Sequence, residues 1–166
     1  MVDLKEFEQK AADLRVLGMK ISIGQDTVYE KYWDEDCRRN IYSASKSFTS
    51  CAVGFAVQEG LIDLDERLVD AFKEDIPNNP DENLKKATVK DLLTMTLGQE
   101  KGFLMGKQRP RMEEQNWVKS SLAIPFVYEP GTHFVYNNVG PYLAGILVQR
   151  RAGCDLLSYL TPRLLK

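Results

Sequence analysis

The sequence predicts an α+β protein in which one helix and one β-hairpin precede a longer, mostly helical region. Apolar residues recur every three or four positions in 3–17 and again in 43–59, as they do along one face of an α-helix. In 19–33, apolar and polar residues instead alternate on both sides of a short glycine-containing turn, which is typical of a hairpin. Since 166 residues suit one domain, we expect a single domain with the helix and hairpin in 1–40 and the helical region in 41–166.

The N-terminal segment carries the local signals of a helix followed by a hairpin. Asp3 is in position to cap the helix, with Glu6 answering it as in a capping box, and Gly18 is in position to end it. The hairpin strands are expected at 19–23 and 27–33, and a charged loop then leads to the next helix. The apolar stripe of the N-terminal helix consists of Leu4, Phe7, Ala11 and Leu14.

The helix predicted at 43–59 is the element around which the rest of the chain is organised. Gly60 follows it and tolerates the left-handed conformation that ends many helices. Because the residues from 51 to 57 are small and apolar, we expect this helix to be central and buried. Its stripe consists of Phe48, Cys51, Ala52, Phe55, Ala56 and Glu59.

Four further helices are predicted downstream, with surface loops at 73–83 and 99–111. Thr88 and Asp155 are residue types that cap helix starts, and Gly153 is typical of the position after a helix. The predicted helices span 88–93, 112–122, 138–151 and 155–166.

Composition excludes several classes of partner and cofactor. A net charge of −2 gives no electrostatic basis for binding nucleic acid, and no apolar run approaches the roughly 20 residues that span a bilayer. The first residues lack an apolar signal region, so we expect a cytoplasmic protein. Cys37, Cys51 and Cys154 are expected to be free thiols, and a single histidine, His133, excludes a multi-histidine metal centre. We therefore expect no metal and no cofactor.

Ser43 and Lys46 form a candidate nucleophile pair. Ser43 is the only serine followed three residues later by a lysine, and this spacing puts both side chains on one face of a helix. A serine needs a neighbour to take its proton, and a desolvated lysine can do so because burial disfavours its charged form. The alternative interpretation makes Ser43 a helix cap and Lys46 a solvated side chain.

Tyr136 and Asn138 form a second candidate pair, between a tight turn and an apolar helix. A tyrosine near an ammonium group has a lowered pKa and can act as a general base, while a carboxamide can hold a substrate amide. The alternatives are that Tyr136 is a core aromatic and that Asn138 caps the helix.

Together these residues resemble a known family. Residues 43–46 read S-A-S-K and match its S-x-x-K motif, and residues 136–138 read Y-N-N and match its Y-x-N motif. The family comprises class C β-lactamases, D-alanyl-D-alanine carboxypeptidases and related esterases. Segments 58–65, 89–98 and 129–132 are also similar to the family, in the family's order.

The resemblance implies a β-lactamase- and penicillin-binding-protein-like transpeptidase fold and a serine hydrolase that acts on an amide, lactam or ester. Ser43 would form an acyl-enzyme, and its backbone N–H would supply one oxyanion donor. Lys46 and Tyr136 would share the proton transfers, and Asn138 would orient a small-molecule acyl substrate.

One departure from the family pattern limits what the resemblance implies. The third motif, a K-T-G or H-x-G triplet on a strand that lines the site, has no counterpart here. The chain therefore resembles the N-terminal part of such an enzyme, a truncated form with impaired activity. An uncovered hairpin edge or truncated face leads us to expect self-association.

Two other hypotheses compete with this one. A Ser-His-Asp esterase with His133 as base would need a G-x-S-x-G turn, which the sequence lacks. A non-catalytic fragment or ligand-binding module of the same fold remains as the alternative.

Overall fold

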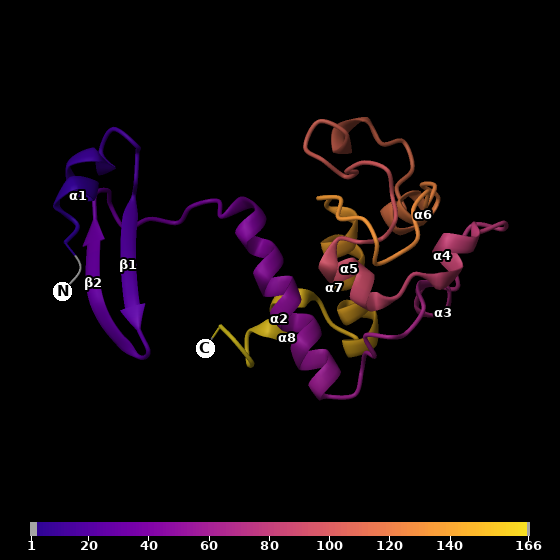
Figure 1. Cartoon of the computed structure of the whole chain (residues 1–166). Helices are drawn as coiled ribbons and strands as arrows, with labels where there is room; N and C mark the ends of the chain where they lie inside the picture. Colours follow the sequence, from indigo (N-terminus) through magenta and orange to yellow (C-terminus); the bar gives the residue numbers. More distant parts are fainter. Residues whose placement is uncertain (1–2, 166) are drawn as a thin grey trace. The chain divides into compact units, whose positions relative to one another are not determined.

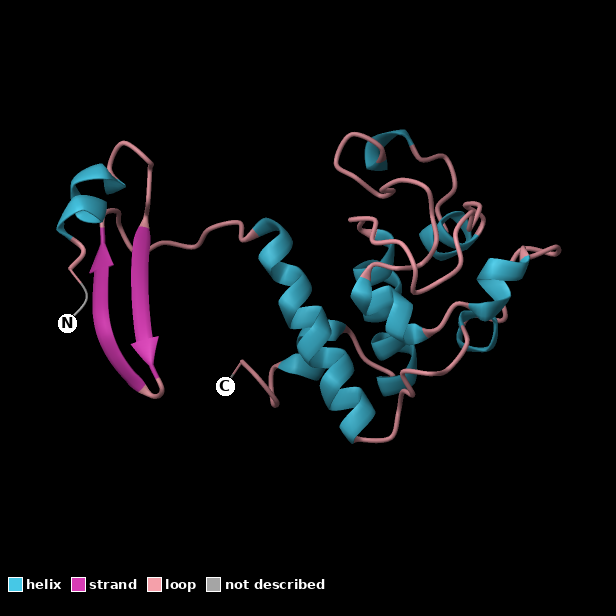
Figure 2. Ribbon diagram, viewed as in Figure 1, coloured by secondary structure: helices cyan, strands magenta, loops and turns pink. Residues whose placement is uncertain are grey.

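The chain divides into two compact units, Met1–Ile41 and Tyr42–Lys166, in a computed structural model that describes residues 3–165 (Figure 1). Helices predominate, and the strands form one two-stranded antiparallel sheet (Figure 2), so the predicted helix-rich α+β class is confirmed. The boundary lies one residue after the predicted division at 40/41. That the two units act as one domain stays a prediction.

The first unit is a hairpin with one short helix across it. Strands β1 (Gly18–Ile23) and β2 (Asp26–Tyr32) pair as predicted, with an irregularity between Ile21 and Ser22. Helix α1 (Lys5–Ala11) contacts the hairpin through Glu8, which accepts from the hydroxyl of Tyr29 at 2.9 Å. The ring of Phe7 in α1 meets the ring of Trp33 edge-on at 6.0 Å between centroids.

Helix α1 ends earlier than predicted. Arg15, not Gly18, adopts the left-handed conformation that closes it, with φ at 53°. The N–H of Val16 donates to Ala11 O at 2.9 Å and that of Arg15 donates to Ala12 O at 3.0 Å, which is the Schellman pattern. At the other end, Asp3 Oδ1 accepts from the N–H of Lys5 at 3.1 Å, and Glu6 takes no part in a capping box.

The second unit is built on helices that pack around α7 (Val139–Ala152). Helices α2 (Ser45–Gln58) and α8 (Leu156–Leu160) pack against α7 and against each other, and α5 (Val89–Thr94) packs on α7 as well. Helices α2, α5 and α7 thus confirm the predicted elements. The remaining helices are α3 (Leu68–Ala71), α4 (Glu82–Lys86) and α6 (Trp117–Leu122), with 3₁₀ turns at Tyr42–Ala44 and Arg109–Arg111.

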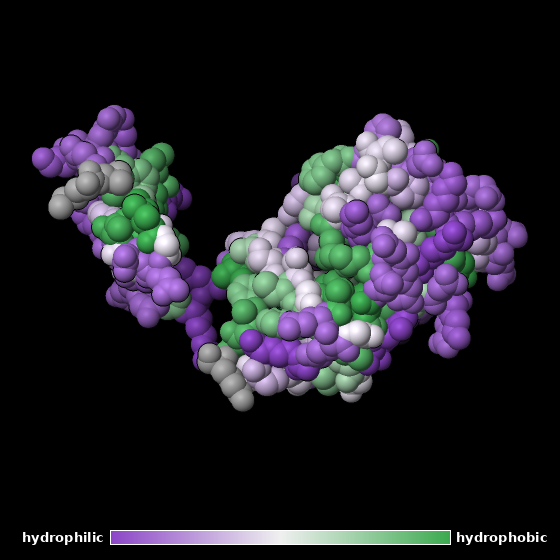
Figure 3. Space-filling view, turned by 60° about the horizontal axis from the view of Figure 1, so that its bottom comes forward, coloured by the Kyte–Doolittle hydropathy of each residue, from purple (hydrophilic) through white to green (hydrophobic). Residues whose placement is uncertain are grey.

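The expectation of a central buried helix is confirmed for one face of α2 only. Ala52, Val53 and Ala56 are buried in the core, whereas Cys51 is exposed and Phe48 is 38% exposed. Green apolar surface is visible on the second unit in Figure 3. Among the residues that the structure describes, none of the helices has both the length and the apolar composition needed to cross a bilayer.

Two predicted helices of the second unit are shorter than expected, and two helices, α3 and α4, were not predicted. Helix α6 begins at Trp117 rather than at 112. Helix α8 ends at Leu160 rather than at 166, and residue 166 lies outside the described residues. Helix α4 lies partly within the expected loop 73–83, where Asp81 caps it by accepting from the N–H of Leu84 at 2.7 Å.

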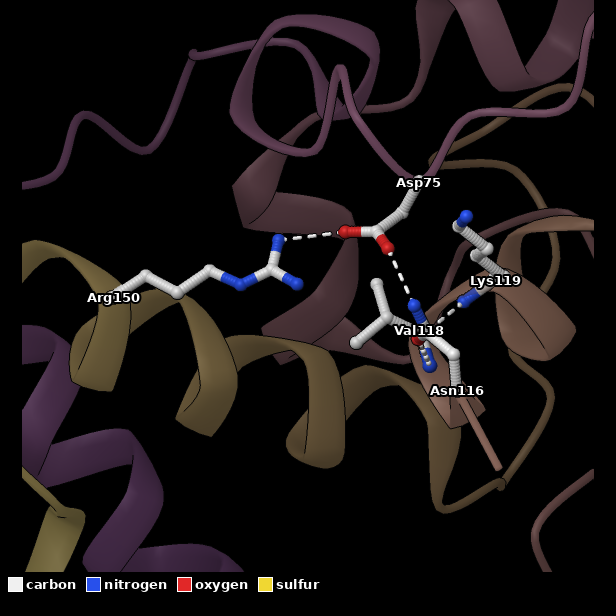
Figure 4. A network of polar contacts seen from close by, with 5 residues as sticks. All are labelled: Asp75, Asn116, Val118, Lys119 and Arg150. Atoms are coloured by element: carbon white, nitrogen blue, oxygen red, sulfur yellow. Dashed lines mark hydrogen bonds and ion pairs between the residues drawn. The ribbon is translucent and has the colours of Figure 1, made fainter. Parts of the chain in front are cut away.

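A buried carboxylate, Asp75, joins three segments of the second unit (Figure 4). Arg150 on α7 donates to it at 2.7 Å, and the amide of Asn116 donates to it at 2.9 Å. The Oδ1 atom of Asn116 accepts from the N–H groups of Val118 and Lys119, which fixes the start of α6. Because Asn116 caps the N–H groups two and three residues after it, the helix begins at Trp117 and does not extend back to 112.

Candidate active site

Ser43 lies in the 3₁₀ turn Tyr42–Ala44, immediately before α2. Its side chain is exposed. Tyr42, the residue before it, has a positive φ of 47°. The hydroxyl of Ser45 donates to the carbonyl oxygen of Tyr42 at 2.6 Å and closes this turn.

Lys46 and Tyr136 meet at the Ser43 hydroxyl. Lys46 Nζ donates to Ser43 Oγ at 3.0 Å, and the Tyr136 hydroxyl donates to the same oxygen at 2.7 Å. Lys46 Nζ also lies 5.2 Å from the centroid of the Tyr136 ring. The structure therefore brings together three predicted site residues, although Tyr136 is 93 positions from Ser43 in the sequence.

The neighbours of Tyr136 shift the pKa of its hydroxyl. Hydrogen bonding with Ser43, and then with Lys46, lowers its pKa from the usual 10.0, because both partners stabilise a phenolate. Its side chain is 45% exposed, so the interpretation of Tyr136 as a core aromatic is wrong. Lys46 is half-buried rather than enclosed, so the desolvation expected of it is partial.

Asn137, which sequence reasoning passed over, holds the Tyr136 segment in place. Its side chain is 1% exposed. Its Oδ1 accepts from the N–H of Gly140 at 3.0 Å and its Nδ2 donates to Val135 O at 3.1 Å. Asn137, two residues before α7 begins, thus satisfies one N–H of the first turn of that helix, and the residue preference that identified Thr88 applies equally to it.

Asn138 does not cap the helix. Its side chain makes no cap bond, and its Nδ2 instead donates to the carbonyl oxygen of Leu104 at 2.9 Å. Its backbone N–H donates to Phe103 O at 3.2 Å. Asn138, two residues after Tyr136, therefore bonds the segment 103–104 to the start of α7.

The loop predicted at 99–111 is in part a packed element of the site. Gln99 and Leu104 are buried. A Cβ atom at Gly102 would lie 2.7 Å from the carbonyl oxygen of Tyr136, so only glycine permits this approach. No local pattern predicts this packing, because it depends on contacts between segments far apart in the chain.

His133 does not reach Ser43. Its Nδ1 lies 2.8 Å from the hydroxyl of Thr132, and its ring stacks on Tyr128 at 4.1 Å between centroids. Within residues 3–165, no carboxylate is hydrogen-bonded to it, so the Ser-His-Asp arrangement is not assembled. Nor do the described residues contain a cluster of three or more histidine, cysteine, aspartate or glutamate side chains suited to a metal ion.

Comparison with known proteins gives one family and one fold. A family model described as Beta-lactamase matches residues 5–166. A curated relative, acyltransferase mokF of Monascus pilosus, is 31% identical over 146 residues, and the match covers 76% of this chain and 35% of the relative. The chain thus spans about a third of that relative's length.

Solved structures confirm the predicted fold. The octameric penicillin-binding protein homologue from Pyrococcus abyssi is 23% identical, with a TM-score of 0.73 over 99% of this chain and 42% of its own. A β-lactamase/D-alanine carboxypeptidase from Pseudomonas syringae is 19% identical, with a TM-score of 0.74 over 96% of this chain and 46% of its own. Simvastatin synthase from Aspergillus terreus is 24% identical, with a TM-score of 0.62 over 95% of this chain and 50% of its own.

Proposed function

Because the chain belongs to the Beta-lactamase family of serine hydrolases, we propose that Ser43 attacks the carbonyl carbon of an amide, lactam or ester and forms an acyl-enzyme. One observation carries the proposal. Lys46 and Tyr136, from segments far apart in the sequence, both lie within hydrogen-bond distance of the Ser43 oxygen. A structural serine at a helix start needs neither of these partners.

In the proposed reaction, Tyr136 is the proton acceptor in its phenolate form. The hydrogen bond that Tyr136 donates in the resting state then reverses, so that Ser43 donates its proton as its oxygen bonds to the carbonyl carbon. When the tetrahedral intermediate collapses, the bond to the amine or alcohol breaks and Tyr136 returns the proton to that leaving group. Lys46 keeps its ammonium beside the phenolate and stabilises it.

Asn138 and the Ser43 backbone complete the proposed site. The Leu104 carbonyl occupies the Nδ2 of Asn138, which leaves Oδ1 to accept from a substrate N–H. The backbone N–H of Ser43 is one oxyanion donor. The K-T-G or H-x-G motif that lines the other side of the site in the family is not found within these 166 residues, and loss of one oxyanion donor typically costs about 10²–10³ in rate. We therefore propose that these 166 residues by themselves acylate slowly, with a non-catalytic ligand-binding role as the alternative.

A second candidate is acyl transfer to an alcohol or amine instead of water. The curated relative at 31% identity is named an acyltransferase, which favours this outcome. Ser43 is exposed, so an acceptor larger than water has access to an acyl group on its oxygen. Both candidates share the acylation step and differ only in what attacks the acyl-enzyme.

Labelling with a fluorophosphonate, followed by peptide mapping, tests the acylation step. We expect the adduct on Ser43, its loss in Ser43→Ala, and no change in Ser47→Ala. Ser47 is an exposed serine of α2, the helix that follows Ser43, and has no lysine three residues after it. An adduct on a different serine, or none at all, contradicts the proposal. Release of the acyl group from a nitrophenyl ester, with and without an added alcohol, then separates hydrolysis from transfer.

The proton-transfer roles are tested by rate and by pH. We expect Lys46→Ala and Tyr136→Phe each to lower the acylation rate by about 10²–10⁴, and His133→Ala to leave it unchanged. The rate should rise with pH along the phenolate fraction of Tyr136, with an apparent pKa below 10.0. A His133 effect as large as that of Lys46 contradicts the assignment.

A further inference from the structure

We propose that Ser45 is a positioning residue, which holds the backbone before Ser43 in the conformation that aims the Ser43 hydroxyl at Lys46 and Tyr136. The inference rests on the proposed role of Ser43 as nucleophile. It concerns the second x of the S-x-x-K motif, a position at which the motif itself requires no particular residue.

The first observation is backbone strain directly before the nucleophile. Tyr42 has a φ of 47°, in the left-handed region that residues with a Cβ adopt only at a cost. The φ and ψ angles of Tyr42 set the direction in which the chain enters Ser43. If Tyr42 relaxes to an ordinary conformation, the Ser43 hydroxyl points elsewhere.

The second observation is the bond that opposes this relaxation. The Ser45 hydroxyl donates to the Tyr42 carbonyl oxygen at 2.6 Å, across the turn that contains Ser43. Among the described residues this is the hydrogen bond that the Ser45 side chain makes, and Ser45 contacts neither Lys46 nor Tyr136 through a polar atom. Its effect on the site therefore passes through the backbone.

The backbone before Ser43 must be held in place because the hydrogen bonds to the Ser43 hydroxyl tolerate little displacement. Two donors, at 2.7 Å and 3.0 Å, converge on one oxygen, and a displacement of about 1 Å breaks either bond. A serine near the start of a helix commonly bonds to a carbonyl three or four residues back. Here, however, the acceptor belongs to a strained residue next to the nucleophile, which gives an ordinary bond a functional consequence.

Three variants test the proposal in the full chain. Ser45→Ala removes the bond, Ser45→Thr keeps a hydroxyl that can bond to the same carbonyl, and Ser47→Ala is the matched control on the same helix. We expect Ser45→Ala to slow acylation of Ser43 about 10–100-fold, with reversible substrate binding unchanged within a factor of about three. Ser45→Thr should restore most of the rate, and Ser47→Ala should match the wild type.

A double-mutant cycle with Tyr42→Asn sharpens the test. Asparagine tolerates the left-handed conformation, so the backbone needs less support in this variant. We therefore expect Ser45→Ala to have a smaller effect on acylation in the Tyr42→Asn background than in the wild type. Equal effects in both backgrounds would contradict the role of backbone strain.

An ultraviolet titration of Tyr136 gives a readout that needs no acylation. Subtracting the spectrum of Tyr136→Phe isolates the signal of the Tyr136 phenol. In every other variant, Lys46 remains the charged neighbour of that phenol. Because the bond to Ser43 is the largest cause of the lowered pKa of Tyr136, misalignment of Ser43 should raise that pKa in Ser45→Ala and not in Ser45→Thr.

The outcomes separate the two proposals. If the wild type fails to acylate but the Tyr136 titration shifts as expected, the proposed function is wrong and the positioning role of Ser45 stands. If the titration and the acylation rate of Ser45→Ala both match the wild type, with circular dichroism unchanged, the positioning role is wrong.

Discussion

The two units of this chain differ in what holds them together. Among the described residues of the unit Met1–Ile41, Ala11 is the one fully buried apolar residue, and the helix and hairpin meet through a few polar and aromatic contacts. Glu8 on α1 pairs with Lys31 and accepts from the hydroxyl of Tyr29 at 2.9 Å. The unit Tyr42–Lys166 instead has a continuous apolar core drawn from α2 through α8.

This difference shows which unit has the better-packed core. The candidate site residues all belong to the second unit; they are Ser43, Lys46, Tyr136 and Asn138. The helix that follows Ser43 and the helix that follows Tyr136 pack on each other in its core. A small hairpin unit buries too little apolar surface to be strongly stable alone. We therefore expect changes in the core of the second unit to have the largest effects and changes in the first unit the smallest.

The largest effect is expected from a cavity in α7. Leu143 is fully buried, so Leu143→Ala should lower the free energy of unfolding by about 2–5 kcal/mol, measured by urea denaturation. Leu157→Ala on α8 is the control, because Leu157 is 67% exposed and its loss should cost under about 0.5 kcal/mol. Similar costs for both would mean that the second unit lacks the fixed core described here.

The next largest effect on stability is expected at the ion pair of Asp75 and Arg150. Removing Arg150 and removing the carboxylate of Asp75 should cost different amounts of free energy. Arg150→Met leaves the buried carboxylate with Asn116 alone, and should cost about 2–3 kcal/mol. Asp75→Asn leaves the Arg150 guanidinium, which is 43% exposed, in contact with water, and should cost about 1 kcal/mol. Thermal melts of both variants decide the order, and the reverse order would contradict the burial argument.

Sequence reasoning succeeded where structure is local and failed where it depends on distant contacts. The hairpin and helices α2, α5 and α7 follow from periodicity and caps within a few residues. The packing of 99–111 beside Tyr136 depends on a bond from Asn138 to Leu104, 34 positions away. Likewise, no local pattern places Tyr136 at Ser43, and that pairing was expected only from the resemblance to a family.

Self-association, expected from the sequence, is a further way to test the comparison. Among the described residues of the first unit, each strand of the two-stranded sheet has one edge without a strand partner, and Val28 on β2 is 47% exposed. We expect light scattering at micromolar concentration to report a mass above 18.9 kDa, and Val28→Lys to lower it, because a lysine on an edge opposes pairing. A monomer at all concentrations would contradict the prediction. An unchanged mass in Val28→Lys would mean that the chains associate through a surface other than the edge of β2.

The smallest effect is expected from acid titration of the first unit. Bonds from Lys31 and Tyr29 hold the pKa of Glu8 below its usual 4.5. Because the pKa is lower in the folded than in the unfolded state, the stabilisation by Glu8 is present above 4.5 and is lost as the pH falls through the folded value. The protection factors of the β1 and β2 amides, which correct for the slower intrinsic exchange in acid, should therefore fall at acid pH.

Glu8→Gln isolates this contribution, because it keeps the shape of the side chain and removes its charge. The protection factors of the hairpin amides should then be lower than in the wild type at neutral pH and vary less with pH on the acid side. Glu82→Gln on α4 is the matched control in the second unit: the pKa of Glu82 is also lowered, first by its bond to Lys85, but its loss should leave the hairpin amides unchanged. A hairpin that exchanges equally in wild type and Glu8→Gln would mean that the apolar contacts of Phe7 and Trp33, not the ion pair, hold α1 on the sheet.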